Sequence, residues 1–398
     1  MQLRFILIIL SFFLAAAGAE PPVDTSTLKG KVMVGYQGWF TCEGDGAELG
    51  WIHWARNRSK PFGPGNVTVD LWPDVSELGE DERFETEFRH ADGSPAYVFS
   101  SHNRKTVLRH FEWMKNYGID GAFVQRFANG IGGGRLTEHK NAVLAHAREG
   151  ANLHGRAWAV MYDLSGLKAG EVARVQEDWR KIRPDGNGSA YLHHEGKPLV
   201  AVWGIGFSDD RKYSLGECQQ LLEFLKADGC SVMLGVPSWW REGKRDAVDD
   251  PALQKLIATA DVVSPWTIGR YANPKQAAKH AEEVWAPDLA WCLEREIDFL
   301  PVVFPGFSWK NLHGGELAQI PRLKGEFLQS QFDAAFEIGA EMIYVAMFDE
   351  VDEGTAIFKC ANDLPVGDGV EFLGYEGLPN DHYLKLTGAA TKRLRESD

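Results

Sequence analysis

Short runs of apolar, β-branched and aromatic residues recur along this chain, and most are separated by segments long enough to form a helix. Such alternation is typical of βαβ units that build a parallel sheet. We expect eight strands, at residues 31–36, 120–125, 156–162, 198–203, 231–236, 261–264, 299–304 and 342–348. The helices expected between them are 104–117, 138–153, 170–182, 215–227, 251–258, 274–296 and 324–338, with a helical tail at the end of the chain. This order of elements predicts an α/β fold, a closed (β/α)8 TIM barrel.

The expected helix 104–117 shows the patterning clearly. Val107, Phe111 and Met114 fall at spacings of i, i+4 and i+7, which place them on one face of a helix. Gly118 then favours an end to the helix. We expect this apolar face to pack on the barrel.

The exception to the regular alternation is the long insertion at residues 37–103, between the first strand and its helix. Loops of such length inside a compact domain are usually functional or disordered. This one contains the tryptophans Trp39, Trp51, Trp54 and Trp72. We therefore expect it to fold as a packed cap over the barrel mouth.

The first residues have the features of an export signal. Arg4 precedes an apolar run at 5–14, and a stretch of small residues ends at Ala19. This pattern predicts a signal peptide over residues 1–19, cleaved after Ala19, and a secreted or periplasmic protein. No later segment offers about 18 uncharged apolar residues in a row, so we expect no membrane span. No repeat or linker interrupts the rest, which predicts a single barrel domain over residues 20–398.

The charge balance restricts the classes of partner. The chain has 42 Lys and Arg against 56 Asp and Glu, a formal net charge of −14. Such a surface repels phosphate backbones, so nucleic acid and anionic membranes are disfavoured as partners. A neutral polysaccharide or oligosaccharide meets no such repulsion.

Other features do not support a metal or a cofactor. The five cysteines are scattered and form no CxxC pair, which disfavours zinc, although one or two disulfides could form in an oxidising compartment. His193, His194 and Glu195 stand in an expected surface turn. The glycine run at 130–134 lacks the third glycine of a GxGxxG motif, because that position is Arg135. We therefore expect neither a metal nor a cofactor.

The clearest chemical signal is the acidic segment that follows the last expected strand. Asp349, Glu350, Asp352 and Glu353 place four carboxylates within five residues. Glycoside hydrolysis needs two carboxyl groups beside the glycosidic bond, and mutual repulsion can keep one of them protonated near neutral pH. A helical turn would place Glu350 and Glu353 on one side. A solvated acidic loop or a divalent-cation site remain alternatives, the latter disfavoured because no Asn or Gln alternates with the acids.

Active sites of this fold lie at the carboxyl ends of the strands and in the loops that follow. Polar and aromatic residues occupy those positions here, a composition typical of a sugar-binding groove. We predict Glu350 and Glu353 as catalytic residues. The predicted substrate-binding residues are Tyr36, Trp39, Gln125, Arg126, Tyr162, Asp163, Trp239, Trp266, Trp309, Asp349 and Asp352.

The segment Asp349-Glu-Val-Asp-Glu-Gly-Thr355 resembles the strand-eight motif Asn-Glu-Trp-His-Glu-Gly-Thr of glycoside hydrolase family 99, the endo-α-mannosidases. It is similar, more loosely, to the corresponding motif of the family 71 α-glucanases. Tyr-Gln-Gly-Trp at 36–39, the segment 110–121 and Phe-Pro-Gly-Phe-Ser at 304–308 agree with the same resemblance. It implies a barrel fold over nearly the whole chain.

The resemblance also implies roles for the two glutamates. In family 99, Glu350 would act as base on the sugar's own 2-hydroxyl and Glu353 would protonate the leaving oxygen, with overall retention. In family 71, the same pair would support inversion through an activated water. The motif departs from family 99 at Asp349, Val351 and Asp352, so the resemblance does not carry endo-α-mannosidase activity itself to this chain.

We therefore hypothesise a secreted glycoside hydrolase that cleaves an α-linked neutral glycan, of an α-mannosidase, α-glucanase or xylosidase/arabinosidase type. Two other hypotheses are a catalytically inactive carbohydrate-binding barrel and a glycan-assembly enzyme. The sugar, the linkage and the oligomeric state are not encoded in any pattern that we recognise.

Overall fold

The barrel strands lie side by side in parallel. The computed structural model describes residues 21–184 and 190–396, so the expected signal peptide at residues 1–19 lies outside the described residues. The strand order is β10-β9-β8-β7-β5-β4-β1-β12-β11. The bounds are β1 (Lys31–Tyr36), β4 (Gly121–Phe127), β5 (Ala157–Asp163), β7 (Lys197–Trp203), β8 (Ser231–Pro237), β9 (Val262–Trp266), β10 (Asp298–Phe299), β11 (Val302–Val303) and β12 (Met342–Val345). The predicted TIM-barrel fold is confirmed.

The seventh barrel strand closes the sheet in two pieces. β10 pairs with β9, and β11 pairs with β12. Between them, the amide of Leu300 still donates to Val263, whereas Pro301 contributes only its carbonyl, which accepts from Tyr344. Proline has no N–H for a sheet ladder, so the expected continuous strand 299–304 is interrupted there.

The last strand is shorter than expected. β12 ends at Val345 rather than at residue 348. The amide of Met347 donates to the carbonyl of Thr355, and the amide of Phe348 donates to the carbonyl of Gly35. The chain thus leaves the regular ladder early and folds back on itself at the carboxyl end of the barrel.

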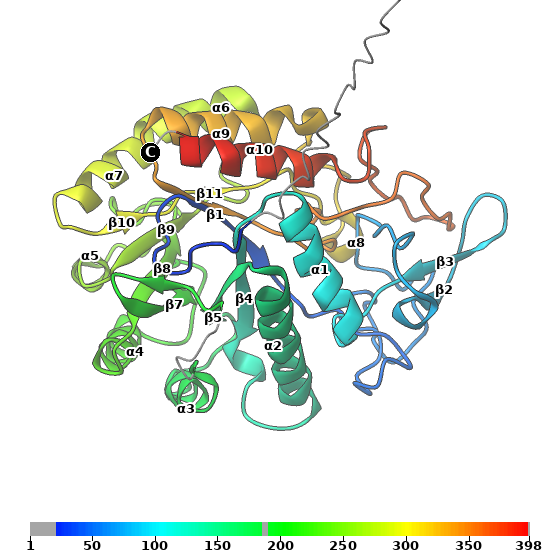
Figure 1. The fold of residues 1–398 in the computed structure, drawn as a ribbon, viewed down its shortest axis with the longest axis horizontal. Helices are drawn as coiled ribbons and strands as arrows, with labels where there is room; N and C mark the ends of the chain where they lie inside the picture. The colour runs from blue at the N-terminus through cyan, green and yellow to red at the C-terminus, as the bar shows by residue number, and fades with distance from the viewer. Residues whose placement is uncertain (1–20, 185–189, 397–398) are drawn as a thin grey trace, which may run out of the picture.

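Helices surround the strands (Figure 1). Their bounds are α1 (Arg104–Asn116), α2 (Arg135–His154), α3 (Ala173–Ile182), α4 (Leu215–Ala227), α5 (Pro251–Ile257), α6 (Pro274–His280), α7 (Ala286–Leu293), the short α8 (Lys310–His313), α9 (Glu326–Glu337) and α10 (His382–Glu396). As expected, Val107, Phe111 and Met114 of α1 are buried. The expected helix 274–296 is divided by a π-helical stretch at Ala281–Trp285, because Pro287 cannot donate a helical hydrogen bond.

The long insertion is packed, as expected, but most of it does not cover the barrel mouth. It contains the antiparallel pair β2 (Phe84–Arg89) and β3 (Pro95–Val98), which lie to one side of the barrel in Figure 1. Trp54 and Trp72 are fully buried, and isolated bridges join the insertion to the segment before α10. Its first residues, 37–39, and its part around residues 52–58 line a cavity at the mouth.

The five cysteines are all buried and free: Cys42, Cys218, Cys230, Cys292 and Cys360. Of the one or two disulfides that the sequence left possible, the structure therefore contains none among the described residues. Among the described residues, no helix is both long and apolar enough to cross a membrane.

Candidate active site

The acidic segment forms a tight turn at the carboxyl end of β12. The amides of Thr355 and Ala356 both donate to the carbonyl of Glu350, at 3.1 and 3.0 Å. This turn closes the loop over residues 351–354 and brings Glu353 close enough to Glu350 for its charge to raise the pKa of Glu350. The expectation of a turn between the two glutamates is met.

Glu350 is held between two hydrogen-bond donors. Its side chain is 4% exposed. Nε2 of Gln37 donates to Oε1 at 2.5 Å, and the hydroxyl of Thr355 donates to Oε2 at 2.5 Å. Burial raises the pKa of Glu350 well above its ordinary range, repulsion from Glu353 adds to this, and the two hydrogen bonds oppose it. The carboxyl group therefore has a fixed orientation, with one donor on each oxygen.

Glu353 has a different environment. It is partly exposed and lines a cavity of about 620 Å³ together with Trp266 and Trp309. Its carboxyl accepts no hydrogen bond from the residues that the structure describes. Burial raises the pKa of Glu353 to about 8, and repulsion from Asp352 and Asp163 contributes. Glu353 thus carries a proton at neutral pH and faces open space.

Asp349 ties the acidic segment to the end of the first strand. It is fully buried, and it accepts from the backbone amides of Gln37 at 2.7 Å and Gly38 at 2.9 Å. Gly38 has a φ of +58°, and a Cβ there would lie 2.5 Å from Val143, so glycine is required. Burial raises the pKa of Asp349 to about 7. Asp349 therefore positions Gln37, which in turn binds Glu350.

Asp352 ties the same segment to the insertion. Its side chain is 2% exposed and lies 2.9 Å from Nδ1 of His53. The ring of His53 stacks on Trp39, with centroids 3.8 Å apart and planes 5° apart. The insertion thus contacts the acidic turn through one histidine and one tryptophan, and Asp352 is not open to a ligand.

A second cavity, of about 530 Å³, is lined by Gln37, the residue that donates to Glu350. Its walls include Gln37, Trp39 and Gln125. Gln125 reaches the barrel interior, where its Nε2 donates to the hydroxyl of Tyr344 at 3.2 Å. Asp163 is nearly buried and accepts from the amide of Ser165 at 2.7 Å.

Three expected site residues lie on the outer side of the barrel wall. The hydroxyl of Tyr36 lies 2.9 Å from Nδ1 of His110 on α1. Arg126 forms a buried ion pair with Asp178 of α3, and Tyr162 donates to the same carboxylate at 2.8 Å. Successive strand residues face opposite sides, so these neighbours of inward-facing positions point toward the helices. As corrections to the sequence-based prediction, Tyr36, Arg126 and Tyr162 do not line either cavity.

The three remaining tryptophans do not form one group. Trp266 and Trp309 line the Glu353 cavity. Trp239 lies instead under Arg245, whose guanidinium carbon is 4.3 Å from the ring centroid, and it makes an edge contact with His280. Trp239 is absent from the walls of both cavities.

Two residues of the site were missed by the sequence analysis. His53 contacts Asp352 although 299 positions separate them, and Lys140 lines the 530 Å³ cavity from α2. No sequence motif marks either residue. Only the fold brings them to the carboxyl end of the strands.

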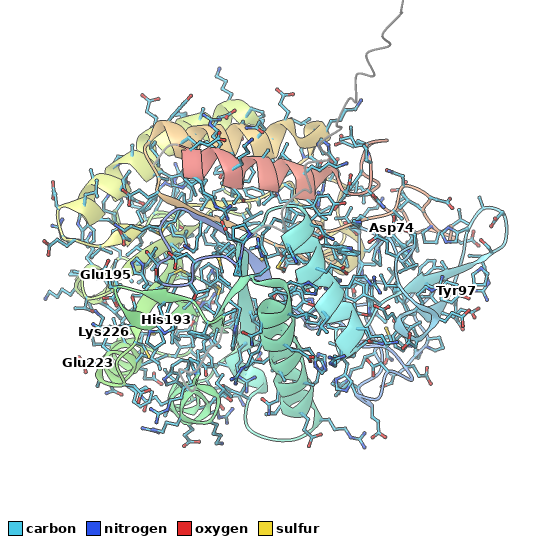
Figure 2. All side chains as sticks on the ribbon, in the orientation of Figure 1. Asp74, Tyr97, His193, Glu195, Glu223 and Lys226 are labelled. Carbon is cyan, nitrogen blue, oxygen red and sulfur yellow. The ribbon has the colours of Figure 1, made fainter. Side chains whose placement is uncertain are left out.

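The histidine pair lies elsewhere. His193 and His194 form β6 (His193–His194), which pairs with β7 in a hairpin, and Figure 2 shows His193 and Glu195 far from Asp74 and Tyr97 of the insertion. The turn itself is as expected, but His194 is fully buried and lies 2.8 Å from Asp298. Among the described residues, His194, Glu195 and Asp298 are the one group spaced to hold a metal, and Lys29 already pairs with Asp298.

The arrangement defines a (β/α)8-barrel protein with one buried and one partly exposed glutamate at the carboxyl end of its last strand. Solved structures share this fold. The GH99 endo-α-mannosidase from Bacteroides thetaiotaomicron aligns with a TM-score of 0.65 and 17% identity, over 93% of this chain and 99% of that one. Its complex with bis-tris-propane aligns with a TM-score of 0.67 and 18% identity, over the same shares of both chains.

A further structure, described as a glycoside hydrolase-like protein, aligns with a TM-score of 0.55 and 14% identity, over 94% of this chain and 97% of that one. The chain is therefore GH99-like in fold, over nearly its whole length. No family model matches the sequence, and no curated protein matches it either.

Proposed function

We propose that this protein is a glycoside hydrolase that cleaves an α-linked glycan, with Glu353 as general acid and Glu350 as base. One observation carries the proposal: two neighbouring carboxyl groups at the barrel mouth have opposite hydrogen-bonding environments. Enzymes of this class need one protonated and one ionised carboxyl group beside the glycosidic bond. The GH99-like fold supports the same class of reaction.

Glu353 suits the role of acid. Its pKa is raised by burial and by neighbouring carboxylates, and no donor in the described structure stabilises its ionised form. It lines a cavity with Trp266 and Trp309, whose rings offer flat apolar faces to a sugar. A glycosidic oxygen placed there would receive the proton of Glu353 as its bond to the anomeric carbon breaks.

Glu350 suits the role of base. Gln37 and Thr355 each donate to one of its oxygens, and these two bonds favour the ionised form and oppose the rise in the pKa of Glu350 that burial causes. It would accept a proton from the group that attacks the anomeric carbon. That group is either the sugar's own 2-hydroxyl, with retention, or a water, with inversion. The anomeric form of the first product distinguishes the two routes.

We also propose that the protein acts outside the cytoplasm, on the basis of the export pattern at residues 1–19. A polysaccharide or oligosaccharide is then the substrate. Trp39 on the Glu350 side and Trp309 on the Glu353 side provide surfaces for sugar rings on both sides of the acids.

The test is a product screen by mass spectrometry on α-mannans, α-glucans and xylose- or arabinose-containing polymers. The native protein, Glu350→Gln and Glu353→Gln are compared with Glu282→Gln, a control at an exposed glutamate of the helix layer. Fragments from the native protein and the control alone support the proposal. Full activity in both site variants, once shown to be folded, would overturn it. Binding of a glycan without any turnover would instead favour a carbohydrate-binding protein.

A further inference from the structure

The 530 Å³ cavity that Gln37 lines has an unusual charge for this chain. The residues that line it include Gln37, Trp39, Arg56, Arg58, Gln125 and Lys140. They include three side chains that are cationic at neutral pH and no Asp or Glu, although the whole chain has a net charge of −14. The local charge is thus opposite to the overall charge.

Lys140 stands out among these cations. It projects from α2, its Nζ lies 5.1 Å from the centroid of the Phe127 ring, and it is half-buried. In the described part of the chain, its ammonium group makes no hydrogen bond and no ion pair. Burial lowers the pKa of Lys140 to about 8, so the group is still charged at neutral pH. The Phe127 ring and the longer-range attraction of Asp163 and Asp178 compensate the burial of this ammonium group only in part, and an anion in the cavity would add to that compensation.

The two arginines that line the cavity, Arg56 and Arg58, are exposed, and neither has a carboxylate partner among the described residues. Arg56 donates to the backbone carbonyls of Leu312 and Asn311, which orient the guanidinium without neutralising it. The guanidinium of Arg58 makes no hydrogen bond or ion pair with any residue that the structure describes. No carboxylate of the described residues therefore neutralises the positive charge of either side chain.

The carboxylates of Glu350 and Asp352 do not line the cavity. Glu350 is bonded to Gln37 and Thr355, and Asp352 is bonded to His53 through Oδ2, whereas its buried Oδ1 accepts no hydrogen bond within the described residues. In addition, the side-chain oxygens of Gln37 and Gln125 are buried and accept no hydrogen bond within the described residues. Two unsatisfied acceptors indicate a ligand that carries hydroxyl groups. The cavity thus offers cations for an acid and acceptors for hydroxyls.

We infer that this cavity is a subsite for an acidic sugar, one that carries a carboxylate or a sulfate ester, held by Lys140 and Arg58 next to the bond that is cleaved. The inference rests on the proposed function and narrows its substrate class. It replaces the expectation of a neutral glycan, which was drawn from net charge alone. Trp39 and Phe127, which stack at 5.1 Å between centroids, provide the apolar wall for the sugar ring.

The test compares matched acidic and neutral α-linked polymers. Dextran sulfate is paired with dextran, and polygalacturonate with its methyl ester. Binding is measured by isothermal titration calorimetry and cleavage by mass spectrometry, for the native protein, Lys140→Met, Arg58→Met and the control Lys255→Met, an exposed lysine of α5. The sulfate pair and the carboxylate pair distinguish the two sources of charge.

We expect the native protein and Lys255→Met to bind at least one acidic polymer about 10-fold or more tightly than its neutral partner, since a hydrogen bond to a charged group contributes that much. Lys140→Met and Arg58→Met should each reduce this ratio about 10-fold while remaining folded by circular dichroism. An equal affinity for both members of each pair, no binding to either acidic polymer, or an unchanged ratio in Lys140→Met would overturn the inference. Because the ratio is measured by binding, it is independent of whether Glu350 and Glu353 catalyse.

Discussion

Replacing Gln37 with methionine tests whether the hydrogen bond from Gln37 lowers the pKa of Glu350. The substitution keeps the length and volume of the side chain and removes the amide that donates to Oε1 of Glu350 at 2.5 Å. Thr355 remains as the donor to the other oxygen. Glu350 would then lose one of the two hydrogen bonds that favour its ionised form.

The size of the effect follows from the type of bond. A hydrogen bond to a charged group contributes about 1.5–3 kcal/mol, so its loss should lower kcat/KM roughly 10- to 100-fold. The direction with pH also follows. The Gln37 bond lowers the pKa of Glu350, so its removal raises that pKa, and a base with a higher pKa is protonated over a wider acidic range. The loss should therefore be greater at pH 6 than at pH 8.

The assay is the pH profile of kcat/KM on the glycan that the product screen identifies. Gln219→Met, which removes an amide that donates to Glu223 on α4, is the matched control. Thermal melting of both variants separates a folding defect from a change at the site. An acidic limb that stays where it is in the native protein, or one that moves to lower pH, would refute the proposed role of Gln37.

Three other perturbations have definite outcomes. Activity should fall as pH rises through about 8, where Glu353 loses its proton, and a profile that stays flat from pH 6 to 9 would contradict the acid role. His53→Ala should lower the free energy of unfolding in urea by about 1–3 kcal/mol, because Asp352 is left buried without its partner; an unchanged midpoint would speak against that contact. Arg126→Met should lower the free energy of unfolding in the same assay by about 3–5 kcal/mol, because Asp178 loses its buried ion partner. The KM of the folded variant should stay unchanged, and a raised KM would restore Arg126 as a substrate contact.

Much of the fold could be predicted from the sequence, because apolar runs in a parallel barrel are buried on both faces and stand out against polar helices and loops. β1 and α4 have the bounds that the pattern predicts. The split of the seventh strand was not predicted, since it depends on a missing N–H at Pro301 and on which neighbour each half pairs with. The free cysteines were also not predictable, because pairing depends on distances that the sequence does not contain.

The site was predictable only where it is local in the chain. The turn that joins Glu350 and Glu353 follows from their spacing and from the strand before them. Position at the end of a strand does not show whether a side chain points into the barrel or toward the helices. A shift of one residue exchanges these two directions. Tyr36 is an example, since its hydroxyl contacts His110 of α1.

The cations of the second cavity come from the insertion and from α2, which meet only in the folded chain. Net charge averages over the whole surface and therefore hid this local excess of positive charge. A functional argument from overall charge is weaker than one from the lining of a cavity.

The most direct test of the account is whether Glu353 supplies a proton to the leaving group. Glu353→Gln should lower kcat/KM on the glycan by about 10²- to 10⁴-fold, the usual contribution of a general acid. On a dinitrophenyl glycoside of the same sugar, whose leaving group needs no proton, the loss should be roughly 10-fold or less, because little protonation remains to be lost. Equal losses on both substrates, or no loss on either, would contradict the assignment of Glu353 as the acid.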